Sequence, residues 1–173
     1  MTRVMAASAP ASSPVSGSAS ASGSVSSSVS GSVSGSVSAV QALQAALAAE
    51  DAAIFGYGVA GAHLSGNRKS AAEQDWTGHN EARDTLTAMI SALGAAPAAG
   101  QAFYRLPFRV NDAASAAKLA AYLEEGVTRA YLGIVAVSDQ RLRTFGALAM
   151  QSSAERAAFW RGTTEAFPGL SPA

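Results

Sequence analysis

Residues 43–64, LQAALAAEDAAIFGYGVAGAHL, carry a regular pattern of core-forming positions. Steps that alternate between four and three residues place side chains along one face of a helix. The positions concerned are Leu43, Leu47, Glu50, Ile54, Tyr57, Gly61 and Leu64. All of them suit a protein core except Glu50. A carboxylate is costly to bury unless a metal ion or another partner neutralises it, so Glu50 is the first candidate for a functional residue.

Upstream of this helix, residues 1–38 consist almost entirely of Ser, Gly, Ala and Val. Such a segment lacks the large apolar side chains whose burial would offset the entropy of ordering it. We therefore expect residues 1–38 to form a disordered tail that contributes nothing to folding. The tail lacks the charged and apolar regions of a secretory signal. Nowhere does the chain contain an apolar run long enough to span a membrane.

The composition of the 173-residue chain excludes several classes of function. Its 12 basic and 12 acidic residues balance, so no nucleic-acid partner is expected. The absence of cysteine excludes disulfides, thiolate metal sites and cysteine nucleophiles. A cytoplasmic location fits this composition. Since C2 dimers are the commonest oligomers, we expect a homodimer, with any small-molecule or protein partner still to be identified.

Helix signals divide the remaining chain into four segments. The predicted helices run from residue 39 to 64, from 69 or 70 to 93, from about 112 to 137 and from 139 to 166. Asn111 or Asp112 is the predicted cap of the third helix, and Asp139 that of the fourth. Residues 94–111 form a long connection in which Phe103, Leu106, Phe108 and Val110 are expected to pack along the outside. The expected domain spans residues 39–167, and residues 168–173 form a short C-terminal tail.

Short turns join the first helix to the second and the third to the fourth, and the long connection joins the two pairs. The sequence therefore predicts an all-α four-helix bundle made of two helical hairpins with a crossover between them. This is the ferritin-like arrangement, as distinct from a simple up-down-up-down bundle.

An internal repeat relates the two hairpins. Shifting the first helix by 74 residues places Glu50 on Glu124 and Tyr57 on Tyr131. The two glutamates should then lie on facing inner surfaces; a register error of one residue would substitute Glu125 for Glu124. On the second helix of each hairpin, His79 and Glu155 lie at roughly the same height as Glu50 and Glu124. We expect these four residues to converge in the bundle interior.

The sequence resembles ferritin-like four-helix domains and, more narrowly, an actinobacterial ferritin-like family of unassigned function. The resemblance covers about residues 40–165. It is carried by Ala-Leu-Gln-Ala-Ala-Leu-Ala-Ala-Glu50, Phe55-Gly56-Tyr57-Gly58-Val59, His79 with Arg83-Asp84-Thr85-Leu86, Leu106-Pro107-Phe108, and Leu123-Glu124 with Tyr131.

This resemblance implies a degenerate di-iron site. Ferritin-like di-iron proteins take one glutamate from each of two helices and a Glu-x-x-His motif from each of the others. Glu50 and Glu124 correspond to the single glutamates, and His79 and Glu155 to the first positions of the motifs. Alanine stands where both histidines are expected, at Ala82 and Ala158. The candidate metal-binding residues are thus Glu50, His79, Glu124 and Glu155, and no catalytic residue is predicted.

Three hypotheses follow for this site. In the first, the bundle is metal-free and the carboxylates are paired with His79, Arg83 or other arginines. In the second, the site retains one iron, manganese or zinc ion. In the third, the site is a polar pocket that binds a small ligand. We favour a non-catalytic or ligand-binding bundle in which no cofactor is expected. The alternative is a metal-dependent oxidoreductase or iron-handling protein that uses iron or manganese. Tyr57 and Tyr131 are expected to be core tyrosines with bonded hydroxyls, and Trp76 and Trp160 to be packing residues.

Overall fold

The computed structural model describes residues 30–164, which form four helices. These are α1 (Ser30–Gly61), α2 (Gly66–Ala92), α3 (Ala113–Val135) and α4 (Gln140–Arg161). The prediction of an all-α chain with four helices is confirmed for this part of the chain. None of these helices is both long and apolar enough to cross a membrane.

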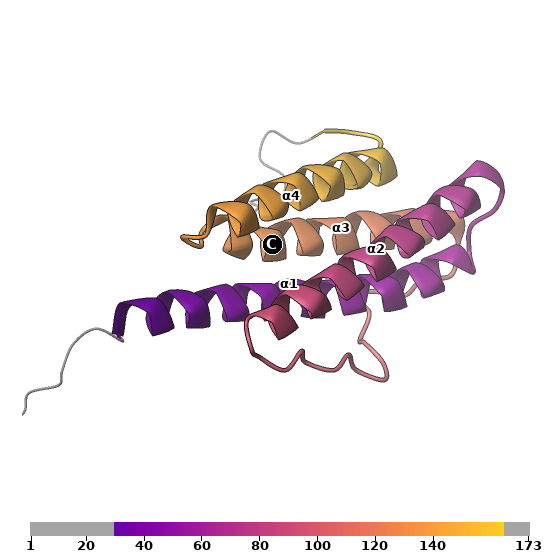
Figure 1. Ribbon diagram of the computed structural model, residues 1–173. Helices are drawn as coiled ribbons and strands as arrows, with labels where there is room; N and C mark the ends of the chain where they lie inside the picture. Colours follow the sequence, from indigo (N-terminus) through magenta and orange to yellow (C-terminus); the bar gives the residue numbers. More distant parts are fainter. Residues whose placement is uncertain (1–29, 165–173) are drawn as a thin grey trace, which may run out of the picture.

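The helices pack as two hairpins held together through α1 and α3 (Figure 1). Helix α1 packs against α2 and α3, and α3 packs against α4. In Figure 1, α1 and α3 run in opposite directions, whereas α2 and α3 run in the same direction. Because α2 and α3 are parallel, the segment between them has to return along the length of the bundle.

Two helix ends differ from the prediction by five residues or more, and the other ends by three or four at most. Helix α1 begins at Ser30, so the predicted boundary at residue 39 is wrong for residues 30–38. Extending an existing helix costs much less than starting one, and the packed part of α1 supplies the start. Helix α4 ends at Arg161, well before Phe167, because Gly162 adopts the left-handed conformation that terminates helices (φ 75°). The structure does not describe residues 1–29 and 165–173. The rest of the predicted N-terminal tail and the whole predicted C-terminal tail therefore lie outside the described residues.

Both predicted aspartate caps are confirmed. The carboxylate of Asp112 accepts a hydrogen bond from the backbone N–H of Ser115 (2.7 Å). The Ser115 hydroxyl in turn accepts from the backbone N–H of Asp112, which completes a capping box. Asp139 accepts from the backbone N–H groups of Arg141 and Leu142 (2.8 and 2.9 Å). Each cap satisfies N–H groups that the first turn of a helix leaves without partners.

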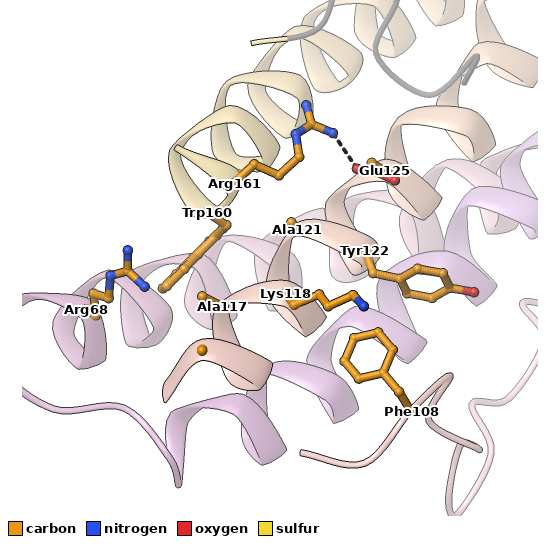
Figure 2. Close-up of a pocket in the computed structure, with 10 residues that line it drawn as sticks. Arg68, Phe108, Ala117, Lys118, Ala121, Tyr122, Glu125, Trp160 and Arg161 are labelled. Atoms are coloured by element: carbon orange, nitrogen blue, oxygen red, sulfur yellow. Dashed lines mark hydrogen bonds and ion pairs between the residues drawn. The ribbon is translucent and has the colours of Figure 1, made fainter. Parts of the chain in front are cut away.

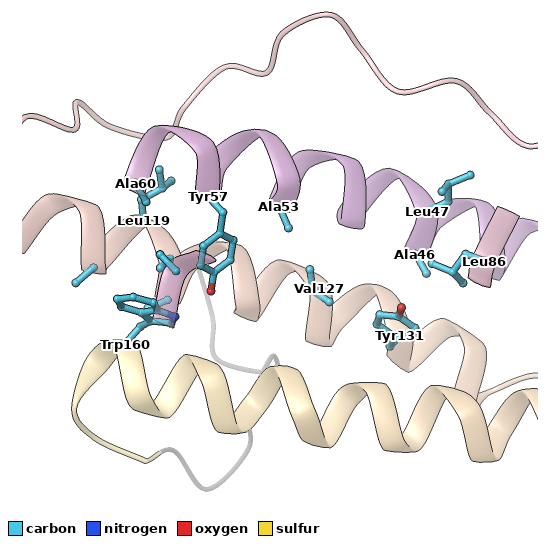
Figure 3. Close-up of a cluster of buried hydrophobic side chains, with 14 of the residues drawn as sticks. Ala46, Leu47, Ala53, Tyr57, Ala60, Leu86, Leu119, Val127, Tyr131 and Trp160 are labelled. Atoms are coloured by element: carbon cyan, nitrogen blue, oxygen red, sulfur yellow. The ribbon is translucent and has the colours of Figure 1, made fainter. Parts of the chain in front are cut away.

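Small residues bring α1 close to α3. Alanines recur at every seventh position of α1, at Ala39, Ala46, Ala53 and Ala60, and all are buried. Figure 3 shows Ala53 pointing towards α3, with Tyr57 in the same interface. A Cβ atom at Gly56 would lie 2.4 Å from Leu123 Cδ1, so the absence of a side chain there permits the close contact. This spacing brings the polar groups of α1 and α3 within bonding distance.

The buried face of α4 is displaced by one residue from the predicted one. The prediction placed Leu142, Phe145, Leu148, Ser152, Glu155 and Phe159 towards the core. Leu142 and Phe145 are confirmed, since both pack, partly buried, against the core. The fully buried positions are instead Gly146, Ser153, Ala157 and Trp160, and Leu148 and Phe159 are exposed. A Cβ atom at Gly146 would lie 3.0 Å from Ile134 Cβ, so this glycine allows the close packing of α4 on α3. On α2, Trp76 and Leu93 are likewise more exposed than predicted.

The connection between α2 and α3 is fixed to the bundle by side chains. Gln44 of α1 donates to the carbonyl of Ala96 (2.8 Å) and accepts from the N–H of Ala98 (2.9 Å). The predicted outer packing is confirmed for Leu106, Phe108 and Val110, which contact the core. It is wrong for Phe103, which is 69% exposed.

Candidate functional site

Three of the four predicted site residues meet in the bundle interior. Glu50, His79 and Glu124 are each at most 1% exposed and lie in contact. Glu124, and not Glu125, faces the core. The fourth prediction is wrong: Glu155 is exposed on α4, where it accepts a hydrogen bond from Gln151 (3.0 Å). The one-residue displacement of α4 turns Glu155 outwards and brings Arg156 towards the interior.

His79 bridges the two buried glutamates. Its Nδ1–H donates to Glu50 Oε2 (2.6 Å), and its Nε2–H donates to Glu124 Oε1 (3.0 Å). An imidazole nitrogen donates only when it carries a proton, so the imidazolium is the form that donates from both nitrogens. Burial alone would lower the pKa of His79, but the hydrogen bonds to Glu124 and Glu50 outweigh it and raise the pKa to about 9. His79 is therefore a buried imidazolium at neutral pH.

Two tyrosines complete a reciprocal arrangement between α1 and α3. Tyr57 of α1 donates to Glu124 of α3 (2.6 Å), and Tyr131 of α3 donates to Glu50 of α1 (2.8 Å). Burial, followed by the neighbouring carboxylates, raises the pKa of both phenols. Each tyrosine thus remains a neutral donor. The expectation of core tyrosines with bonded hydroxyls is confirmed.

Arg156 supplies the second positive charge. Its Nε–H donates to Glu124 Oε1 (2.8 Å), and its Nη2 donates to the hydroxyl of the buried Ser153 (3.1 Å). Burial favours the neutral form of Glu124, but the bonds and charges of His79 and Arg156 outweigh it and lower the pKa of this carboxyl. Arg83, a predicted partner of the glutamates, instead pairs with Asp84 (2.8 Å).

Asp75 and Trp160 close the site on one side. The indole N–H of Trp160 donates to Asp75 Oδ2 (2.8 Å), which also lies 3.2 Å from the Tyr57 hydroxyl. Partial burial raises the pKa of Asp75, and the bond from Trp160 opposes that shift. Trp160 also packs edge-on against Tyr57, with ring centroids 6.2 Å apart.

We call this group the polar cluster. It consists of Glu50, Tyr57, Asp75, His79, Glu124, Tyr131 and Arg156. At its centre, the fully buried Glu50 and Glu124 face one imidazolium and one guanidinium, so the charges of these two glutamates are balanced within the protein. Asp75 is a third carboxylate at the edge of the cluster, more exposed than the glutamates and 3.9 Å from the same guanidinium. Such pairing removes most of the cost of burying each charge alone.

The donor set does not fit a di-iron centre. Both oxygens of Glu50 accept hydrogen bonds, and both nitrogens of His79 face carboxylates. Glu124 Oε1 accepts three hydrogen bonds, which leaves Oε2 as the one carboxylate oxygen of this pair without a partner among residues 30–164. Within the same residues, no group of three or more His, Cys, Asp or Glu side chains is arranged to hold a metal ion. Arg156 places a cation where an incoming metal ion would be repelled.

Sequence reasoning missed Arg156, Ser153 and Asp75. The internal repeat contains a signal for the first two. The shift of 74 residues that relates Glu50 to Glu124 also relates His79 to Ser153, and Ala82 to Arg156. It relates the buried Ala72 and Leu86 to the buried Gly146 and Trp160 as well. Keeping the same shift in α2 and α4 would have excluded Glu155.

The fold and the site define a four-helix bundle with an internally neutralised polar core. A family model described as a domain of unknown function (DUF4439) matches residues 42–172. A conserved hypothetical protein, Rv2844, from Mycobacterium tuberculosis has a similar crystal structure, with a TM-score of 0.71 and 31% sequence identity. The match covers 73% of this chain and 96% of that one. The chain belongs to the DUF4439 family. No functionally curated protein matches its sequence significantly.

Proposed function

We propose that this protein is a ferritin-like bundle that has exchanged metal ions for internal cations, and that it acts as a non-catalytic, small-ligand-binding protein. The observation that carries the proposal is the charge balance of the polar cluster. His79 and Arg156 contact the same glutamate oxygen. In a di-iron bundle the corresponding carboxylates neutralise metal ions.

The helix arrangement supports the ferritin-like part of the proposal. A long crossover between two hairpins distinguishes ferritin-like bundles from bundles with short loops throughout. Here α2 ends at Ala92 and α3 begins at Ala113, and both run in the same direction (Figure 1). The positions three residues after His79 and Ser153, which the 74-residue repeat relates, are Ala82 and Arg156, and the absence of histidine at both agrees with the loss of the metal pair.

Iron loading tests the metal-free state. Protein purified without a histidine tag would receive ferrous iron anaerobically and then oxygen, while the near-ultraviolet absorbance of oxo-bridged ferric iron is followed. We expect no stoichiometric signal. A signal equivalent to two irons per chain, lost in Glu50→Gln, would overturn the proposal and support the alternative of an iron- or manganese-dependent oxidoreductase or iron-handling protein.

Comparing two conservative substitutions tests the charge balance itself. Glu50→Gln should be tolerated, because a neutral His79 can accept from the new amide while the amide oxygen still accepts from Tyr131. Glu124→Gln should destabilise the protein by about 2 kcal/mol, because it removes the charged acceptor of three donors, including Arg156. Urea unfolding measures both. Equal losses would contradict the unequal roles of the two glutamates.

The proposal includes a cytoplasmic homodimer. An apolar groove of about 310 Å³ between α3 and α4 contains Leu132, Val135 and Met150, and the nearby Leu148 is 62% exposed. Light scattering at tens of micromolar should give twice the chain mass, and Leu132→Lys should reduce it to one chain. A monomer mass for the wild type would contradict the dimer. Fractionation of the source cells tests the location.

A further inference from the structure

A second hollow lies outside the polar cluster. Its volume is about 510 Å³, within the range of pockets that hold small organic ligands. Helix α3 forms its floor with the buried Ala117 and Ala121. Figure 2 shows Arg68 and Trp160 on one side of this floor and Phe108 and Tyr122 on the other. Three aromatic rings and a floor of methyl groups suit a flat apolar body.

The same pocket carries an excess of positive charge. Arg68, Lys118 and Arg161 line it together with a single carboxylate, Glu125. Arg161 pairs with Glu125, as the dashed line in Figure 2 marks, and so that carboxylate is already engaged. Lys118 contacts the face of the Phe108 ring (4.8 Å from its centroid), and no carboxylate of the described part of the chain pairs with it. Arg68 makes no hydrogen bond or ion pair with any residue from 30 to 164. Two cations therefore lie at this pocket without a carboxylate partner among residues 30–164.

The start of α2 adds to this field. Arg68 belongs to the first turn of α2, which contains no acidic side chain. Ser65 precedes that turn and makes no side-chain capping bond. The N-terminus of a helix carries a partial positive charge and unbonded N–H groups. Both features favour an anion near Arg68.

We propose that this pocket binds a small organic anion, one flat apolar body bearing a carboxylate or phosphate group. The body lies on Ala117 and Ala121 between Phe108 and Trp160, and the anionic group reaches Arg68 or Lys118. This inference rests on the proposed role as a ligand-binding bundle and names the ligand class. No residue of the polar cluster lines this pocket. The two are connected by Trp160, which lines the pocket and whose indole N–H donates to Asp75 of the cluster.

Trp160 provides a reporter within the pocket. The chain contains two tryptophans, and Trp76 lies elsewhere, partly exposed on α2. In a Trp76→Phe background all indole emission comes from Trp160. The probes are 4-nitrophenyl phosphate, 4-nitrobenzoate, the uncharged 4-nitrobenzyl alcohol and inorganic phosphate. The three nitro compounds share a flat body that quenches indole emission, and inorganic phosphate serves as a competitor without that body.

The two anionic nitro compounds should quench Trp160 saturably, with an affinity at least about tenfold above that of the alcohol, as one charge-assisted contact provides. Arg68→Ala and Lys118→Ala should each weaken the tighter anion by about the same factor. Lys69→Ala and Arg129→Ala remove one positive charge from the same helices outside the pocket and should leave binding unchanged. Raised salt should weaken the anions and spare the alcohol.

Several outcomes would overturn the inference. These are equal affinity for the alcohol and the anions, equal losses in the pocket and control variants, and absence of saturable quenching. Inorganic phosphate that competes as well as the aromatic anions would show a simple anion site and would contradict the role of the apolar walls. Iron loading is a separate measurement, so a failure here leaves the charge balance of the polar cluster intact.

Discussion

His79 donates to Glu50 and Glu124 at once, and this position links its protonation to stability. Its pKa rises from 6.5 to about 9 on folding, so the folded state binds the proton more tightly than the unfolded state. The resulting stabilisation is fully present below pH 6.5 and is lost as the pH rises through about 9. Urea unfolding should show a decrease on the order of 3 kcal/mol across this window.

Nuclear magnetic resonance tests the same titration directly. The chain has two histidines, so a His63→Gln variant leaves one imidazole signal, that of His79. The midpoint of that signal should lie near 9. A midpoint below 6.5 would mean that His79 is neutral in the folded protein, and would contradict the imidazolium bridge.

Arg156 and Glu155 are neighbours with opposite expected effects. Arg156→Ala should destabilise the protein by about 2 kcal/mol, because it leaves the buried Glu124 with one cation fewer. Glu155→Ala should change stability by less than about 0.5 kcal/mol, since Glu155 is exposed. Thermal or urea unfolding measures both. The reverse order would show that the register of α4 is the one predicted from sequence.

At the scale of the helix, two glycines should respond to the same substitution with opposite signs. Gly146→Ala should destabilise by about 1–3 kcal/mol, because the new methyl group would meet Ile134 and the backbone of Val135 at 3.0–3.2 Å. Gly58→Ala should stabilise by about 0.5–1 kcal/mol, because alanine favours the helix and no atom beyond the local helix lies within 4 Å. Equal effects in unfolding experiments would contradict the close packing of α4 on α3.

The sequence predicted helices with a strong apolar face better than helices with a small-residue face. Glu50 was found because Leu47 and Tyr57 flank it at helical spacing, and Glu124 because the 74-residue repeat relates it to Glu50. On α4 the core-facing positions are small ones such as Gly146, Ser153 and Ala157, and these carry little hydropathy signal. Leu148 and Phe159 have the spacing of a core-facing stripe, but they stand one residue away from the buried face and are exposed.

The same weakness of the apolar signal explains why Arg156 and Asp75 of the polar cluster were not predicted. Arginine is rarely buried, so Arg156 has no place in a list of core positions drawn from residue type. Its partner Glu124 was predicted from the repeat. The prediction then matched His79 with Glu155, which lies two positions beyond Ser153, the residue that the 74-residue repeat relates to His79. Asp75 stands three residues after Ala72 and four before His79, on the same face of α2, but the prediction chose the neighbouring apolar Trp76 for this turn.

For the whole molecule, residues 1–38 lack the large apolar side chains whose burial stabilises a fold, whereas Ala39, the first position of α1 whose side chain the structure describes, is buried. We therefore expect deletion of residues 1–38 to leave the melting temperature unchanged within error. Deletion through residue 47 should prevent folding, because it removes Leu43 and Leu47, which are at most 2% exposed. A fall of several degrees with the shorter deletion would show that the N-terminal segment contributes to folding.

The reciprocal Tyr57–Glu124 and Tyr131–Glu50 bonds are what a two-fold dimer of identical hairpins would contain. In such a dimer every position near the symmetry axis occurs twice, so one histidine would entail a second. A single covalent chain is free of that constraint. One half carries His79 and the other Ser153, with Arg156 in place of Ala82. Joining both hairpins in one polypeptide thus allowed an asymmetric interior, in which two equivalent glutamates share one imidazolium and only one of them contacts a guanidinium.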